Sequence, residues 1–310
     1  MYESLKEHTK NFHLYIFTFD QLSNDILNNL KLEKVTVISL SDFENDELLK
    51  VKTKRSKAEY CWTCTPSTIH YILENYDVLN CTYIDADLFF YRSPEILIQE
   101  MYDAGKNVLI TEHRYNKLAK IRDKERAGKF CVQFITFTND EDSKEVLNEW
   151  KDKCIDSCYA KYEDGKFGDQ KYLDEWPGKY ENIHILENLG GGVAPWNVAQ
   201  YKMKSKRNAL VSKNKRIPQE FDLVFYHFHF IRFINSMKVD IGWNYLPRFA
   251  IKNIYKPYIT SLVNQERRLE LLDSGYIWSF YKNTSKGPRE IVKYLIKKFT
   301  GFNILKIKNY

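Results

Sequence analysis

Tyr83-Ile84-Asp85-Ala86-Asp87-Leu88-Phe89-Phe90 is the stretch of sequence that points to the fold. In an extended segment, residues i and i+2 point the same way, so Asp85 and Asp87 project together while Ala86 faces away. Open α/β folds bind ligands at the carboxyl ends of their strands. Two ionised carboxylates this close need a counter-cation, and Mg²⁺ or Mn²⁺ suits such oxygens. We predict a divalent metal site at Asp85 and Asp87; the alternative is a solvated acidic turn.

The segments around this stretch alternate between strand and helix patterns. Strand patterns occupy residues 12–19, 34–40, 81–84, 107–111 and 130–137. Helix patterns occupy residues 20–32, 56–76, 94–101 and 139–159, with Pro94 in the first turn of the third and Asn139 as the cap of the fourth. This alternation predicts an α/β fold with a mainly parallel, mixed sheet that is flanked by helices on both faces.

Positive charge is concentrated at the end of the chain. Residues 281–310 carry a net charge of +7, whereas the whole chain carries +6. We therefore expect a catalytic domain over residues 1–245 and a helical, basic extension over residues 246–310. The charge distribution also argues against nucleic-acid binding.

A basic amphipathic helix is predicted over residues 288–299. Ile291, Leu295 and Phe299 fall at i, i+4 and i+8 and form one apolar stripe. Such a helix can lie on an anionic membrane surface. The alternative is that the stripe packs on the catalytic domain and the lysines are solvated.

Two further segments carry residues suited to a polar site. Phe225-Tyr226-His227-Phe228-His229-Phe230 places two histidines on one face of an extended segment. Leu189-Gly190-Gly191-Gly192-Val193-Ala194-Pro195-Trp196-Asn197 contains three glycines, which permit close approach of the backbone. We expect this second segment to form a wall of the site, with Trp196 offering a flat face to a sugar ring; the alternative is a plain turn.

The Asp85-Ala86-Asp87 trio resembles the D-x-D motif of nucleotide-sugar glycosyltransferases with the GT-A (Rossmann-like) fold. The segment Phe167-Gly168-Asp169-Gln170-Lys171-Tyr172-Leu173 resembles the D-Q-x-x-L stretch of family 8 glycosyltransferases and related bacterial lipopolysaccharide and surface-glycan transferases. The similarity covers roughly residues 10–245. Asp169 would also serve as a helix cap without any catalytic role.

The resemblance implies roles for individual residues. Asp169 would bind the hydroxyl groups of the donor sugar, and Gln170 would lie beside the anomeric carbon, as the catalytic pair. His227, or alternatively His229, would complete the metal site. The residues assigned to substrate binding are Tyr83, Ala86, Gln133, Gly191, Gly192 and Trp196.

The function implied is transfer of a hexose from a nucleotide-diphosphate sugar to a glycan or lipid-linked acceptor, with Mn²⁺ or Mg²⁺ as cofactor. Bacterial surface polysaccharide or lipopolysaccharide synthesis is the expected setting, and retention at the anomeric carbon is the expected outcome. The alternatives are a non-catalytic nucleotide-sugar or glycan-binding protein and a haloacid-dehalogenase-like phosphohydrolase, which also uses D-x-D after an apolar strand.

The sequence departs from the family 8 pattern in two places. That family follows its histidine with H-x-x-G-x-x-K-P, whereas Lys256-Pro257 stands far from His229. The chain also opens with a helix pattern at residues 1–5, so either the usual first strand is lacking or the protein begins upstream of Met1.

The remaining expectations concern compartment and cysteines. With no secretory signal and no run of ~20 apolar residues, we expect a cytoplasmic protein that docks on the inner face of the plasma membrane. Its cysteines should then be thiols. Cys61/Cys64 and Cys154/Cys158 have ligand-like spacing, so a zinc or redox site is an alternative to burial as small hydrophobic residues.

Overall fold

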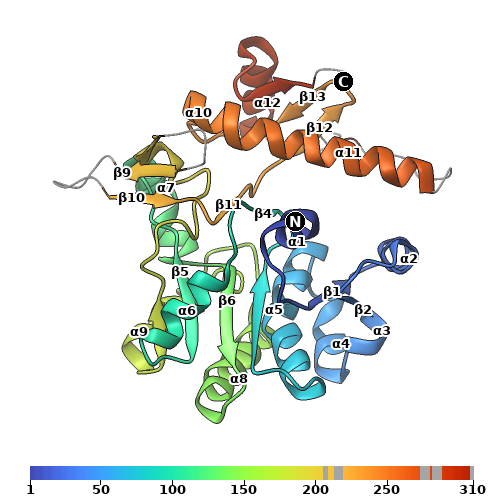
Figure 1. Cartoon of the computed structure of the whole chain (residues 1–310), viewed down its shortest axis with the longest axis vertical. Helices are drawn as coiled ribbons and strands as arrows, with labels where there is room; N and C mark the ends of the chain where they lie inside the picture. The colour runs from blue at the N-terminus through green and yellow to red at the C-terminus, as the bar shows by residue number, and fades with distance from the viewer. Residues whose placement is uncertain (205–208, 213–218, 273–279, 281–287, 308–310) are drawn as a thin grey trace.

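The computed structural model describes residues 1–204, 209–212, 219–272, 280 and 288–307. A four-stranded sheet forms its centre (Figure 1). The strands run in the order β3 (Asn80–Ile84), β6 (Phe130–Thr138), β5 (Val108–Glu112) and β7 (Ile183–Ile185). β5 and β7 are parallel, whereas β6 is antiparallel to both β3 and β5. All nine residues of β6 are buried, as expected of a strand covered on both faces.

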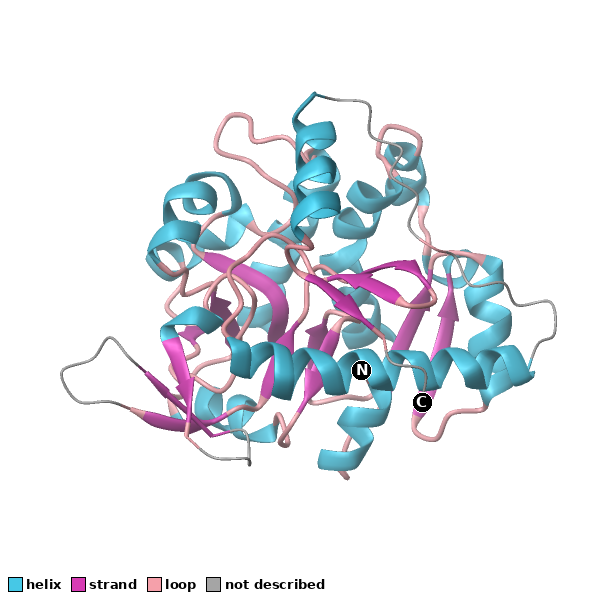
Figure 2. Ribbon diagram, turned by 90° about the horizontal axis from the view of Figure 1, so that it is seen from above, coloured by secondary structure: helices cyan, strands magenta, loops and turns pink. Residues whose placement is uncertain are grey.

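Helices cover both faces of this sheet (Figure 2). On one face, α5 (Lys57–Asn75) and α8 (Glu141–Asp156) pack in the same hydrophobic cluster as Ile135 of β6. α1 (Tyr2–His8) and α6 (Glu95–Asp103) belong to a second cluster, which includes Phe134. Since Phe134 and Ile135 are neighbours on one strand, the two pairs of helices lie on opposite faces.

The expected fold class is confirmed as an α/β fold with a mixed sheet flanked by helices. Each predicted strand and helix is present, with small shifts at its ends. One predicted cap is wrong: α8 begins after Asp140, whose carboxylate accepts the Ser143 N–H at 2.9 Å, and not after Asn139. Asn139 instead donates to the backbone oxygens of Leu73, in the last turns of α5, and of Val78, beyond that helix, at 3.3 and 3.1 Å.

A groove separates the central sheet from a parallel pair of strands near the N-terminus, β1 (Leu14–Thr18) and β2 (Val35–Ser39). It has a volume of about 510 Å³ and is lined mainly by apolar side chains, including those of Phe12, Ile69 and Phe134. Among the described strands, none pairs with the edges of β1 and β3 that face this groove. Ala86 lines the groove too, so it reaches the metal-binding stretch.

Smaller elements complete the described chain. The additional strands are β4 (Leu88–Phe90), β11 (Phe225–His227), β8 (Tyr201–Met203), β9 (Ala209–Ser212) and β10 (Glu220–Asp222). The additional helices are α2 (Gln21–Leu30), α3 (Leu40–Phe43), α4 (Asp46–Lys52), α7 (Lys117–Ala127) and α9 (Trp176–Lys179), with 3₁₀ turns at Lys171–Glu175 and Val198–Gln200. Among these, the helices α3, α4 and α7 and the strands β8, β9 and β10 were not predicted from the sequence.

The C-terminal part lies above the carboxyl end of β3 (Figure 1). It contains α10 (Arg248–Ala250), a π turn at Ile251–Tyr255, α11 (Lys256–Leu272), α12 (Pro288–Thr300) and the antiparallel sheet β12 (Arg232–Asn235), β13 (Lys238–Asp240) and β14 (Ile304–Lys306). Tyr258 of α11 stacks on Phe228, with ring centroids 3.7 Å apart. Hydrophobic contacts therefore cross residue 245, where we predict the domain boundary. In the described part of the chain, no helix combines the length and apolar character needed to cross a membrane.

Candidate metal and substrate site

Two distant segments meet at the metal-binding stretch. β3 ends at Ile84, and the Asp85 N–H donates to the backbone oxygen of Gln133 at 3.1 Å, which extends the ladder by one residue. β4 then pairs antiparallel with β11, in a register that sets Leu88 opposite His227. Because Asp87 directly precedes Leu88, this register brings His227 beside the carboxylate pair.

The three side chains converge on one point. His227 Nε2 lies 3.1 Å from Asp87 Oδ1 and 3.5 Å from Asp85 Oδ2. One ligand atom from each residue falls within 4.8 Å of the others, and among the described residues this is the one cluster of three or more acidic, histidine or cysteine side chains so arranged. His229 is not part of it; that residue is exposed and has a positive φ of 53°. The geometry therefore favours His227 over His229.

In the absence of a metal ion, the imidazole of His227 is positively charged and lies between the carboxylates of Asp85 and Asp87. Burial acts to lower the pKa of His227, but the charge of Asp87, their hydrogen bond and the charge of Asp85 raise it well above its usual value. Burial raises the pKa of Asp85, while the positive His227 keeps the pKa of Asp87 below its usual range despite burial. Without a metal ion, the imidazolium supplies the positive charge that the acids need; a divalent ion can replace that proton.

Gln133 orients the imidazole. Its Oε1 lies 2.6 Å from Nδ1 of His227, and an amide oxygen only accepts, so Nδ1 carries a proton and Nε2 faces the carboxylates. The Gln133 side chain is fully buried, and its Nε2 has no hydrogen-bond partner among the described residues. Orientation of a histidine ligand through its other nitrogen is usual at metal sites. The sequence predicts a substrate-binding role for Gln133, which stays a prediction, but it does not predict the contact with His227.

The glycine segment runs beside β11. The backbone oxygen of Val193 accepts the His227 N–H at 2.9 Å. A Cβ at Gly192, whose φ is +79°, would lie 2.6 Å from Thr111 Cγ2 and 3.1 Å from Gln133 Nε2, so only glycine fits. Gly191 is buried against Leu97 and Leu186. These glycines let the segment pack tightly behind the histidine.

Trp196 is buried beside the same histidine. Its ring lies edge-on to His227 at 5.3 Å and to His229 at 5.4 Å between centroids. The ring of His113 packs against it from another side at 5.2 Å. The Trp196 indole N–H is buried without a partner among the described residues. Trp196 thus fixes the position of the metal-site histidine, and its contact with a sugar stays a prediction.

Asp169 belongs to the same electrostatic neighbourhood. It is 7% exposed, and burial, followed by the charge of Asp85, raises its pKa to about 7. The Thr65 side chain and the backbone N–H groups of Asp169 and Gln170 act in the opposite direction and lower that pKa. The Asp169 backbone oxygen accepts from the Trp150 indole at 2.8 Å, which holds it against α8. The Tyr83 hydroxyl donates to Asp85 Oδ1 at 3.0 Å. Burial, followed by the charges of Asp85 and Asp169, raises the pKa of this hydroxyl.

The structure contradicts one alternative for Asp169, that of a helix cap, and shows where the side chain of Gln170 lies. Asp169 does not cap the following 3₁₀ turn, because Gln170 stands at that position without a side-chain cap. The Gln170 amide donates to the backbone oxygen of Ala127 at 2.8 Å, at the end of α7. Its contact with a donor sugar stays a prediction.

Two contacts were not foreseen from the sequence. The half-buried Arg114, at a φ of 48°, donates to the backbone oxygens of Asn188 and Gly191 and so holds the glycine segment in place. The buried Cys131 thiol lies close enough to His227 to help raise the pKa of the imidazole. Local sequence patterns contain no signal for either contact, because each depends on which strands are neighbours.

The cysteine pairs do not form a site with the acids. All six cysteines are free thiols, and the described metal-binding cluster includes none of them. Cys154 and Cys158 are buried, and Cys64 lies in the core around α5. These three cysteines are therefore buried as small apolar residues.

Comparison with known proteins gives two relatives in Bacillus subtilis (strain 168). The uncharacterized protein YfnD is 31% identical over 281 residues, which cover 89% of this chain and 86% of YfnD. The uncharacterized protein YfnF is 29% identical over 245 residues, covering 77% of this chain and 78% of YfnF. Apo mouse xyloside xylosyltransferase 1 shares 12% identity with a TM-score of 0.45, covering 74% of this chain and 89% of that one. A structural likeness of this extent decides nothing about activity. No family model matches the chain.

Proposed function

The chain belongs to the same family as YfnD of Bacillus subtilis, and for this member we propose metal-dependent glycosyl transfer from a nucleotide-diphosphate sugar. The observation that carries the proposal is the convergence of Asp85, Asp87 and His227 at the carboxyl end of β3. Within it, the Nε2 atom that Gln133 orients faces both carboxylates. The D-x-D and D-Q resemblances add to the proposal.

The donor set fits a hard divalent ion. Carboxylate oxygens suit Mg²⁺ and Mn²⁺, and the imidazole nitrogen shifts the preference towards Mn²⁺. Such an ion, when bound, neutralises the diphosphate as it leaves the sugar. Asp85, Asp87 and His227 would hold it, while Gln133 and Tyr83 keep the ligand atoms oriented.

Asp169 is proposed as the residue that meets the donor sugar. A carboxyl with a pKa of about 7 exchanges a proton readily near neutral pH. In the transfer, the bond between the anomeric carbon and the diphosphate oxygen breaks, and the acceptor oxygen bonds to that carbon. The acceptor proton must pass to a base. If Asp169 were that base the product would be inverted, whereas the D-Q resemblance favours retention, which we propose.

The acceptor is proposed to be a glycan or a lipid-linked glycan of bacterial surface polysaccharide or lipopolysaccharide synthesis. This part rests on the resemblance of residues 85–87 and 169–170 to those transferases. A family 8 assignment rests on the same two stretches.

The test is release of nucleoside diphosphate from a panel of nucleotide-sugars, with Mn²⁺ or Mg²⁺ and with chelator. We expect release that requires the ion and is lost in Asp87→Ala. Asp152→Asn, an exposed change on α8, is the matched control and should keep full activity. Metal-dependent binding of a nucleotide-sugar without turnover would favour a binding protein. Hydrolysis of a simple phosphate ester would favour a phosphohydrolase. Full activity in chelator would refute the proposal.

A further inference from the structure

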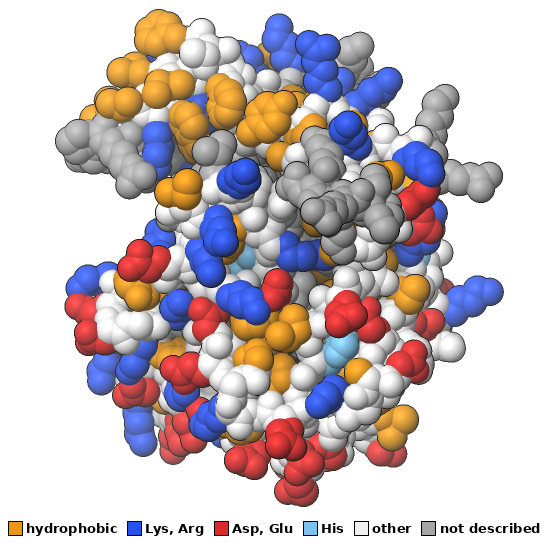
Figure 3. All heavy atoms as spheres, turned by 90° about the vertical axis from the view of Figure 1, so that its left-hand side faces the viewer, with side chains coloured by type: hydrophobic (Ala, Val, Ile, Leu, Met, Phe, Trp, Pro, Cys, Tyr) orange, Lys and Arg blue, Asp and Glu red, His pale blue; other side chains and the backbone are white. Residues whose placement is uncertain are grey.

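Helix α12 turns its apolar side outward. Its large apolar residues are all exposed, from 42% at Leu295 to 80% at Phe299; they are Ile291, Val292, Tyr294, Leu295, Ile296 and Phe299. Figure 3 shows hydrophobic side chains gathered at the top of the molecule, with Lys and Arg side chains beside them. The stripe predicted from the sequence therefore does not pack on the catalytic domain.

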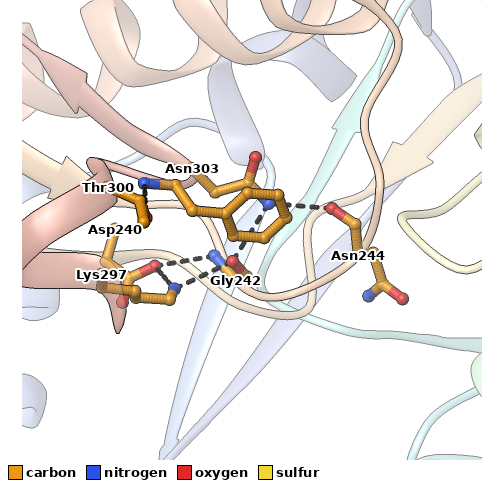
Figure 4. Close-up of polar contacts among 7 residues, drawn as sticks. Asp240, Gly242, Asn244, Lys297, Thr300 and Asn303 are labelled. Carbon is orange, nitrogen blue, oxygen red and sulfur yellow. Dashed lines mark hydrogen bonds and ion pairs between the residues drawn. The ribbon is translucent and has the colours of Figure 1, made fainter. Parts of the chain in front are cut away.

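A lysine, not the apolar stripe, attaches this helix to the protein. Lys297 is 8% exposed; its ammonium pairs with Asp240 of β13 and donates to the Gly242 oxygen at 2.8 Å (Figure 4). The ammonium also lies 4.6 Å from the centre of the Trp243 ring. Asn303, just beyond the helix, donates to the backbone oxygens of Gly242 and Asn244. These contacts fix α12 in an orientation that leaves its stripe uncovered among the described residues.

Positive charge without a counter-charge lies on the same small sheet. Lys238 of β13 is directly opposite Lys306 of β14, and both are exposed. Like charges placed opposite each other on paired strands destabilise a sheet. Neither lysine has an ion-pair partner in the part of the chain that the structure describes. Since alternate residues of a strand share a face, Lys238 lies on the face of β13 from which Asp240 reaches α12.

We propose that α12 and the Lys238–Lys306 pair form a docking surface for an anionic lipid membrane. A lipid interface covers the apolar stripe, and its headgroups supply the negative charge that this pair lacks. The C-terminal part stands at the end of the molecule that holds β4 and β11, so docking would bring the metal site near the membrane (Figure 1). The inference does not depend on glycosyl transfer.

The test is co-sedimentation of the intact protein with vesicles, without donor or metal. Vesicles of phosphatidylcholine alone are compared with vesicles that also contain phosphatidylglycerol, at low and high salt. We expect binding to the anionic vesicles, weakened by salt. Phe299→Ser should weaken it by about tenfold or more, since burying such a ring is worth at least about 1.5 kcal/mol. Lys238→Ala should weaken it about fivefold at low salt, from about 1 kcal/mol per cation.

The matched control is Leu79→Ser. Leu79 is 86% exposed, as apolar as the stripe, and lies before β3, outside the C-terminal part. It should bind vesicles like the parent protein. All variants are first compared by thermal unfolding. Because the changes are at exposed positions, we expect the variants to unfold at the same temperature as the parent protein. Equal loss in Leu79→Ser, equal binding to neutral vesicles, or no binding at low salt would each overturn the proposal. So would self-association that Phe299→Ser abolishes in the absence of vesicle binding, which would assign the surface to a second copy.

Discussion

Replacing Asp169 by Asn should stabilise the protein at alkaline pH while leaving its stability at acid pH almost unchanged. The pKa of this carboxyl is raised from 3.8 to about 7, chiefly by burial and then by Asp85. In the unfolded chain it ionises near its ordinary value. A carboxyl with a raised pKa therefore favours folding below about pH 4, and this contribution is lost as the pH rises through about 7. The amide carries no such dependence.

The magnitude follows from the shift. About three pKa units at 1.36 kcal/mol each give about 4 kcal/mol as an upper limit at pH 8 or above. The amide that replaces this carboxyl has nearly the same size and shape, so the packing around residue 169 is kept. The assay is urea unfolding at pH 4 and pH 8.5 in chelator, which keeps the site in the ion-free state. We expect a stability difference between variant and parent that grows with pH.

Asp152→Asn is the control for this experiment, because Asp152 is an exposed carboxylate on α8. It should give no pH-dependent difference. If Asp169→Asn is equally destabilising at both pH values, the carboxyl is ionised and satisfied in the folded protein, and the reasoning is wrong. If our functional proposal holds, the same variant is also inactive, which would make Asp169 a residue that costs stability in exchange for activity.

The remaining predictions concern the metal site and the product. Mn²⁺ affinity, measured by calorimetry, should rise with pH by about tenfold per unit while His227 still holds the proton that the ion displaces; affinity that is flat with pH would exclude this competition. Gln133→Leu should weaken Mn²⁺ binding about 10- to 100-fold with little change in fold, as loss of an orienting partner does, whereas unchanged affinity would make Gln133 a packing residue. His229→Ala should bind Mn²⁺ like the parent protein, and a large loss would restore His229 as the ligand. Proton NMR of the first-formed product should show the anomer of the donor; the opposite anomer would mean inversion, with Asp169 as the base.

The sequence predicts well what is encoded locally. The Asp85–Asp87 pair, the strand before it and most of the flanking helices follow from side-chain periodicity and from a few helix caps. The structure favours the same histidine, His227, because it lies in β11 opposite Leu88 and so beside Asp87, whereas its role as a metal ligand stays a prediction. The cap of α8 is misplaced by one residue, since adjacent Asn and Asp are both good caps and the tertiary contact of Asn139 decides between them.

What depends on strand neighbours was not predictable from one sequence. Gln133 contacts His227 only because β6 lies beside β3 and the β4–β11 pair closes over it. The same holds for α12. Periodicity predicts that one side is apolar, but only the structure shows that Asp240 buries Lys297 on the other side and leaves the stripe exposed.

The antiparallel pairing of β4 with β11 means that the three proposed metal ligands come together only when two segments far apart in the sequence pair. Asp87 follows β3, whose strand partner β6 lies in the first half of the chain, but His227 comes from a much later segment and must pair with β4 in the correct register. A slip of one residue would turn the imidazole to the opposite face of the strand and leave two acids without a third ligand. An ion bound by all three residues would therefore cross-link early and late parts of the polypeptide. At a concentration a hundredfold above its Kd, the ion should stabilise the folded state by about 2.7 kcal/mol against separation of these strands. Fragments that end before residue 225 should lack this cross-link, because they lack His227, even if their sheet is intact.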